Sequence, residues 1–194
     1  MKTVFFDIDT QIDFLFPAGA LYVPGAEKLL PAIARLNRYA AGHGIPVVST
    51  TCAHAEDDPE FRHWPPHCVV GTAGQAKPAA TLLERRAVIP SRPQRLDLAG
   101  AQQILLEKQE LDLFTNPNLP RLLEEFGAEE YCVYGVVTEY CVRCAAMGLL
   151  DTGASVRLVS DAVRSLKPGD SERTLREFVS RGGVLTTVEE ICGG

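Results

Sequence analysis

The chain has 194 residues and a formal net charge of −6 at pH 7, with 46% hydrophobic and 23% charged residues. This balance is typical of a globular protein with a sizeable core, and we expect one domain over residues 1–194. The negative charge and the absence of a lysine or arginine cluster argue against a nucleic-acid partner, and no apolar run is long enough to cross a membrane.

The N-terminal third begins with an apolar segment, 3–9, that predicts a strand ending in carboxylates. An acidic residue already at position 7 is too early for a secretory signal, so we expect a cytoplasmic protein. Its six cysteines are then thiols or metal ligands rather than disulfides. An amphipathic helix over 24–42 and a buried strand over 45–51 follow, and the long loop 52–80 is typical of functional loops.

The remaining elements alternate between the two types. We predict strands at 87–90, 103–108, 131–137, 156–163 and 184–187, and helices at 117–127, from 139 onward and at 171–182. Strict alternation favours a parallel sheet covered on both faces, in which ligands bind beyond the carboxyl ends of the strands. Polar residues stand at four such ends: Asp9, Cys52 with His54, Lys108 and Cys141.

Cys141 lies just after the apolar strand 131–137, in the first turn of a predicted helix. The unpaired N–H groups and the dipole of a helix start lower a thiol pKa, and the same N–H groups can bind an oxyanion. The position therefore indicates a catalytic nucleophile. The alternative is a small buried hydrophobic residue.

Three motifs resemble those of the isochorismatase-like cysteine hydrolases, and within that family the nicotinamidases. They are D-T-Q-I-D-F at 9–14, W-P-P-H-C-V-V-G-T at 64–72 and G-V-V-T-E-Y-C-V at 135–142. Their order and spacing fit, and the similarity covers nearly the whole chain. The resemblance implies a three-layer α/β/α sandwich around a central, mainly parallel six-stranded sheet.

The resemblance also implies a triad of Asp9, Lys108 and Cys141 that hydrolyses small amides, with nicotinamide as the leading substrate. A cysteine thiolate attacks the amide carbonyl to form a thioester, and Asp9 accepts the thiol proton and returns it to the leaving ammonia. Lys108 holds Asp9 ionised and stabilises the thiolate. By the same resemblance, a cis peptide joins Val136 to Val137 and directs the N–H of Val137, with that of Cys141, at the oxyanion.

Two aromatic residues, Phe14 and Trp64, are expected to line the substrate pocket, where flat faces suit a ring. Core packing is the alternative for Phe14. The family implies no organic cofactor.

A divalent metal near the triad is a further implication of the resemblance, but the loop departs from the family. Cys52 replaces an aspartate, and a histidine position falls at about Asp58, or at Asp57 or Glu56 if the register shifts. The set that we expect is Cys52, His54, Asp58 and His67. Thiolate, imidazole and carboxylate together favour zinc. Loss of the metal is the alternative.

Other interpretations remain open. Relatives with the same triad cleave other small amides, ureido compounds or isochorismate. The segment 5–10 is also similar to the start of haloacid dehalogenase-type phosphatases, with Asp7 as nucleophile. Cys141 and Cys144 form a C-x-x-C pair, which predicts oxidation sensitivity. A non-catalytic protein of this fold would lose the triad residues, and family members are expected to form homo-oligomers.

Overall fold

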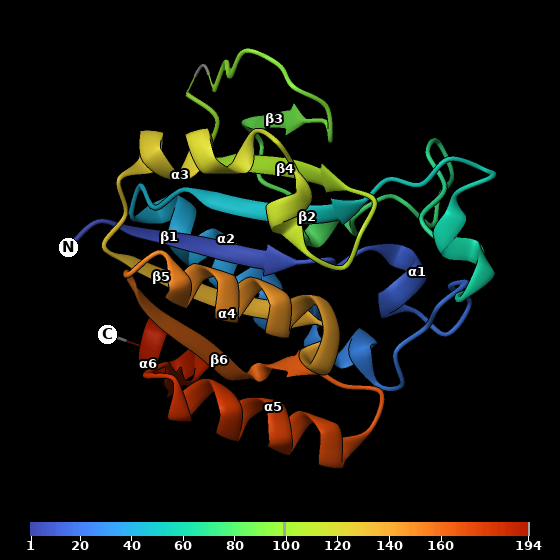
Figure 1. The fold of residues 1–194 in the computed structure, drawn as a ribbon. Helices are drawn as coiled ribbons and strands as arrows, with labels where there is room; N and C mark the ends of the chain where they lie inside the picture. Colours follow the sequence, from blue (N-terminus) through green and yellow to red (C-terminus); the bar gives the residue numbers. More distant parts are fainter. Residues whose placement is uncertain (99, 194) are drawn as a thin grey trace.

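The computed structural model describes residues 1–98 and 100–193 (Figure 1). Its strands are β1 (Thr3–Ile8), β2 (Val47–Cys52), β3 (Arg86–Ile89), β4 (Gln103–Lys108), β5 (Glu130–Val136), β6 (Ser155–Arg164) and β7 (Val184–Thr186). Its α-helices are α1 (Ile12–Leu15), α2 (Leu30–Gly42), α3 (Leu119–Phe126), α4 (Arg143–Asp151), α5 (Pro168–Ser180) and α6 (Val188–Cys192). Short 3-10 helices span Ala26–Leu29, Pro59–Arg62, Ala79–Thr81 and Leu113–Thr115.

The sheet contains seven strands in the order β3-β4-β2-β1-β5-β6-β7, and all the neighbouring pairs are parallel. The expectation of six strands is therefore wrong. Both edge strands are short, with four residues in β3 and three in β7, but each pairs along one side with a longer neighbour. An outer strand needs only one such partner to join the sheet.

Helices cover both faces of the sheet, which confirms the three-layer architecture. Helices α3, α4 and α5 lie on one face, and α1, α2 and α6 lie on the other (Figure 1). Successive side chains of β1 point to opposite faces, so Phe5 joins the core beneath α2 while Phe6 joins the core beneath α4. None of the helices in the described part of the chain is long and apolar enough to cross a membrane.

Two predicted helices begin differently in the structure. The segment 24–42 opens with a 3-10 turn, because Gly25 adopts a left-handed φ of 80° and α2 starts only at Leu30. After β5, residues Thr138–Val142 form a π-helical turn that leads into α4. Cys141 therefore lies in this wider turn, a feature that is frequent at functional sites.

The long loop after β2 folds over the carboxyl ends of β1 and β2 (Figure 1). Two side chains of the 9–14 motif hold it there. The Gln11 amide donates to the carbonyl oxygens of Cys52 and Gln75, at 2.8 and 2.7 Å. The buried Asp13 carboxylate accepts from the Cys68 N–H at 2.7 Å. The loop is thus fixed against the strand ends at which the candidate site residues stand.

Candidate active site

Asp9, Lys108 and Cys141 meet at the carboxyl edge of the sheet. Asp9 follows β1, Lys108 is the last residue of β4, and Cys141 lies in the turn after β5. All three are buried, with exposed fractions of 1%, 1% and 7%. Residues that are 33 or more positions apart in the sequence are therefore neighbours, because parallel strands end at a common edge.

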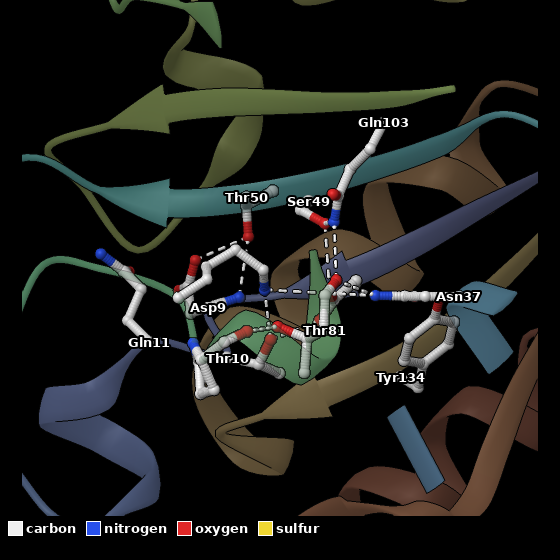
Figure 2. Close-up of polar contacts among 12 residues, drawn as sticks. Asp9, Thr10, Gln11, Asn37, Ser49, Thr50, Thr81, Gln103 and Tyr134 are labelled. Carbon is white, nitrogen blue, oxygen red and sulfur yellow. Dashed lines mark hydrogen bonds and ion pairs between the residues drawn. The ribbon is translucent and has the colours of Figure 1, made fainter. Parts of the chain in front are cut away.

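Lys108 lies at the centre of this group. Its Nζ is 2.8 Å from Asp9 Oδ2 and 3.6 Å from Cys141 Sγ. The same ammonium donates to the carbonyl oxygen of Glu110 at 2.9 Å, which fixes its position. The other Asp9 oxygen, Oδ1, accepts from the Thr50 hydroxyl at 2.6 Å (Figure 2). Each oxygen of the Asp9 carboxylate therefore has a donor.

Electrostatics favour an ionised Asp9 beside a charged Lys108. Burial raises the pKa of Asp9, but the Lys108 charge and hydrogen bonds from Cys141, Lys108 and Thr50 outweigh it and hold the pKa below its usual value. Burial lowers the pKa of Lys108, but Asp9 and the two nearby thiols raise it well above its usual value. The pair is therefore charged over the physiological pH range.

Cys141 differs from the expectation. Burial and the Asp9 charge raise the pKa of its thiol well above the usual value, and Lys108 offsets only part of this effect. The prediction of a lowered thiol pKa is wrong for the resting site, because desolvation of a buried sulfur exceeds the effect of a helix start. The resting state is a neutral thiol next to an ionised carboxylate, which is the pairing that a general base requires.

A pocket opens over two members of the triad, Lys108 and Cys141, which both line it. Both residues predicted to line it, Phe14 and Trp64, do so, as does Val137. The Trp64 ring packs edge to face on Tyr140, with centroids 5.6 Å apart. The remaining lining residues are mostly apolar: Leu21, Val23, Cys52, Glu60, His67, Lys108, Glu110, Leu111, Tyr140, Cys141 and Leu166. Tyr140 was missed, although it directly precedes Cys141 in the third motif.

The peptide bond between Val136 and Val137 is cis, as the resemblance implies. It stands at the end of β5, directly before the turn that carries Cys141. The two residues predicted to form the oxyanion hole, Val137 and Cys141, both line the pocket.

Three of the four predicted metal ligands lie together. The ligand atoms of Cys52, His54 and His67 are within 4.8 Å of one another, and all three residues are buried. His67 Nδ1 lies 2.8 Å from the Pro65 carbonyl oxygen, which only accepts, so its Nε2 is free to bind a metal. Burial lowers the pKa of His67, which favours the neutral ring that a metal needs.

His54 supplies the observation that most directly supports a metal. Its Nδ1 lies 3.0 Å from Asp58 Oδ2, which leaves Nε2 as the acceptor. That buried Nε2 has no hydrogen-bond partner among the described residues. An orphaned imidazole nitrogen beside a thiol and a second imidazole fits a zinc-type donor set.

The fourth predicted ligand, Asp58, belongs to a second possible donor group, with His54 and Glu60. Its Oδ1 caps the 3-10 helix by accepting from the Glu60 N–H at 2.9 Å, and its Oδ2 binds His54 Nδ1. It orients the imidazole, as carboxylates commonly do behind metal-binding histidines. Glu60 Oε2, 3.8 Å from His54 Nε2, is the carboxylate on the ligand side. Sequence spacing did not single out Glu60. The two residues expected as alternatives to Asp58, Glu56 and Asp57, are exposed.

The phosphatase interpretation with Asp7 as nucleophile loses support from these positions, whereas the oxidation sensitivity of Cys141 and Cys144 stays a prediction. Asp7 is fully buried, lies outside the pocket and is bound by Lys77, Thr10 and other donors, so it is not placed as a phosphatase nucleophile. Cys144 is partly exposed, and the second thiol beside Lys108 is that of Cys52, at 3.4 Å.

Comparisons with known proteins agree with this geometry. The isochorismatase domain family matches residues 3–190. The nicotinamidase/pyrazinamidase of Mycobacterium tuberculosis is 27% identical over 193 residues, covering 95% of this chain and 96% of that protein. The maleamate amidohydrolase of Pseudomonas putida is 25% identical, covering 94% and 82%. The structure of the Pyrococcus horikoshii pyrazinamidase in complex with zinc superposes with a TM-score of 0.82 and 30% identity, covering 96% and 99%. The chain belongs to the isochorismatase family, in which it is nicotinamidase-like.

Proposed function

We propose that the chain is a cysteine amidohydrolase that converts nicotinamide and water to nicotinate and ammonia. The observation that carries this proposal is the contact of Lys108 with both Asp9 and Cys141 at the base of an aromatic-walled pocket. Trp64 and Tyr140 offer ring faces and edges suited to a flat heteroaromatic amide.

The first half of the reaction forms a thioester. The Cys141 sulfur attacks the amide carbon while its proton passes to Asp9, so only a transient thiolate is needed. The negative charge moves to the carbonyl oxygen, where the N–H groups of Val137 and Cys141 are the proposed donors. The C–N bond then breaks, and the proton held by Asp9 leaves with ammonia. Lys108 keeps Asp9 ionised at the start of each cycle.

The second half regenerates the enzyme. A water molecule loses a proton to Asp9 as it attacks the thioester carbonyl, and the C–S bond breaks to release the carboxylic acid. The proton returns from Asp9 to the Cys141 sulfur. The released acid gives its proton to ammonia or solvent and becomes nicotinate, and the Cys141 thiol is neutral again.

We further propose a divalent metal, with zinc favoured, held by Cys52, His54 and His67 and approached by Glu60. The donor set and the orphaned His54 Nε2 support this assignment. When bound, the metal supplies a Lewis-acidic position beside the pocket that can bind a ring nitrogen. Asp58 orients His54 for that role.

Three further properties are proposals. The family match over residues 3–190 supports one hydrolase domain over residues 1–194. The net charge of −6 supports a protein without a nucleic-acid partner. We expect a cytoplasmic protein. We also expect a homo-oligomer, and light scattering of the purified chain will test the oligomeric state.

Ammonia release from nicotinamide, compared between the native chain and Cys141→Ala, tests the function. Cys144→Ser is the matched control, because it removes a thiol only three positions away. We expect turnover in the native chain and the control, and none in Cys141→Ala. Turnover that persists in Cys141→Ala would overturn the mechanism. If the native chain leaves nicotinamide intact, maleamate, a ureido compound and isochorismate are the next substrates, since one relative is a maleamate amidohydrolase.

A further inference from the structure

A second buried lysine–aspartate pair lies close to the first. Lys77 Nζ is 2.9 Å from Asp7 Oδ2, and the exposed fractions of the two residues are 6% and 0%. Asp7 belongs to β1, whereas Lys77 comes from the loop that follows β2. Neither residue lines the pocket, and the proposed mechanism uses neither.

The pair forms part of a closed set of contacts around the turn that carries Asp9. The Thr10 hydroxyl donates to Asp7 Oδ1 at 2.6 Å, and the Lys77 ammonium donates to the same hydroxyl. Asp7 and Thr10 lie on either side of Asp9 in the chain. Figure 2 shows Thr10 and Asp9 side by side at this strand end.

Asp9 needs such support because of its backbone. Its φ is +49°, a left-handed conformation that is unfavourable for a residue with a side chain. This conformation turns the chain at the end of β1, where the Asp9 carboxylate meets Lys108. The Thr50 hydroxyl holds Asp9 from one side, because it accepts from the Asp9 backbone N–H and donates to the Asp9 carboxylate. The Asp7–Thr10–Lys77 contacts hold the turn from the other side.

The Asp7 carboxylate is itself rigidly placed. Asn37 and Ser49 each donate to its Oδ2 at 3.1 Å, and the Asn37 amide oxygen accepts from Tyr134 at 2.5 Å. These partners come from α2, β2 and β5, so the carboxylate is anchored to three elements of the core (Figure 2). A displacement of Thr10 relative to Asp7 is therefore a displacement relative to the sheet.

The loop that carries Lys77 has other anchors. The Ile12 N–H donates to the Ala76 carbonyl at 2.9 Å, and Gln11 donates to Gln75 at 2.7 Å. The loop therefore stays docked without the Lys77 ammonium. What the ammonium adds is a contact with both Asp7 and Thr10, which are also joined by their own hydrogen bond.

We propose that Lys77 is a positioning residue for Asp9: by bonding to both Asp7 and Thr10 it reinforces the hydrogen bond between them and so fixes the left-handed turn that directs the Asp9 carboxylate at Lys108 and Cys141. The inference rests on the proposed function, because it assigns a purpose to the geometry of the proposed base. A role in stability alone is the competing explanation, and three variants separate the two.

Thr10→Val keeps the side-chain shape and the Asp7–Lys77 ion pair but removes the hydroxyl. Lys77→Met removes the ammonium and leaves Asp7 without its counter-charge. The double variant Asp7→Asn/Lys77→Met removes both charges, so that no unpaired charge is buried. It lacks the ammonium contact with Thr10, while an amide at position 7 can still bond to the Thr10 hydroxyl. Thermal unfolding of each variant reports stability separately from the position of Asp9.

Two readouts report the position of Asp9. The first is whether a variant changes kcat or KM for nicotinamide. The second is the rate at which iodoacetamide alkylates Cys141, followed by peptide mass spectrometry. In that reaction the sulfur–carbon bond forms, iodide leaves and the thiol proton passes to Asp9, so no amide substrate is needed. Asp9→Asn gives the rate without the base.

We expect kcat to fall at least about 10-fold in Thr10→Val and in the double variant, with KM within about two-fold of the native value. Alkylation of Cys141 should slow toward the Asp9→Asn rate, while the double variant unfolds at the native temperature. Native kcat and native alkylation in a double variant of native stability would overturn the proposal. A native chain without amidase activity would refute the proposed function, but the alkylation comparison would still decide the role of Lys77.

Discussion

The Cys52 thiol lies 3.4 Å from the Lys108 ammonium, nearly the distance of 3.6 Å that separates the ammonium from the Cys141 thiol. Cys52 Sγ is also 3.8 Å from Asp9 Oδ2. Cys52 therefore lies beside Asp9 and Lys108, and its sulfur is within 4.8 Å of the ligand atoms of His54 and His67. One sulfur is thus shared by the proposed metal ligands and the proposed triad.

Replacing Cys52 is expected to change metal selectivity. Cys52→Asp should weaken zinc binding at least about 10-fold and raise the relative affinity for manganese, because a thiolate prefers zinc and a carboxylate does not. Competition with a chromophoric chelator measures both affinities without reference to activity. Cys144→Ser is the control thiol. Unchanged zinc affinity in Cys52→Asp would exclude the sulfur as a ligand.

Lys108→Met removes the charge that holds Asp9 ionised. We expect kcat to fall by about 10²–10⁴-fold, the usual contribution of a general base, because the pKa of Asp9 then rises under the effect of burial. Steady-state kinetics with nicotinamide measure the loss. Lys28→Met, at an exposed position, is the matched control and should retain native rates. A Lys108→Met enzyme within a few-fold of the native rate would contradict the assigned role.

The Asp9–Lys108 pair also predicts how stability depends on pH. The folded pKa of Asp9 lies below its ordinary value of 3.8, so its contribution to stability is present above that value and is lost as the pH falls through the folded pKa. Asp9→Asn leaves the Lys108 charge buried and unpaired, which costs about 3–5 kcal/mol at neutral pH.

Urea unfolding of the native chain and Asp9→Asn between about pH 7 and pH 3 tests this sign. The difference in unfolding free energy should stay constant from neutral pH down to the ordinary carboxyl range and shrink below it. Glu172→Gln, at an exposed position, should show no such dependence. A difference that grows as the pH falls would show that the sign is wrong.

Trp64→Ala removes one wall of the pocket and the edge-to-face partner of Tyr140. We expect KM for nicotinamide to rise about 10-fold, since a buried aromatic contact contributes about 1–2 kcal/mol. Trp64→Phe keeps a ring face and should lose much less. Equal KM values for the native chain and Trp64→Ala would place the substrate elsewhere.

Gly135→Ala tests the junction between β5 and the Cys141 turn. Gly135 has a φ of +120°, and a Cβ there would lie 2.2 Å from the Ile8 carbonyl oxygen. We expect a loss of about 3 kcal/mol or more in unfolding free energy, measured by chemical denaturation. Gly42→Ala at the end of α2 meets no atom within 4 Å and should be neutral or stabilising by up to about 1 kcal/mol. Equal stabilities of the two variants would contradict the close approach.

The sequence by itself determined the fold class, the subgroup motifs and the positions of the triad residues. Alternating apolar strands and amphipathic helices are local patterns, and they predict a parallel sheet without any contact being known. Asp9, Lys108 and Cys141 stand at the ends of predicted strands, and the resemblance to the isochorismatase-like hydrolases implied them as a triad. The edge strand β7 is only three residues long, and whether such a segment pairs depends on its neighbour.

Only the tertiary structure decided the protonation state of Cys141, the partner of Asp58 and the place of Lys77. Burial raises the pKa of the Cys141 thiol. How deeply this thiol is buried depends on the whole fold and cannot be predicted from its position near the start of a helix. Asp58 caps a short helix and orients His54, which spacing within a 29-residue loop could not indicate. The Lys77–Asp7 contact joins residues 70 positions apart, and a pattern that repeats every two or four residues carries no information at that separation.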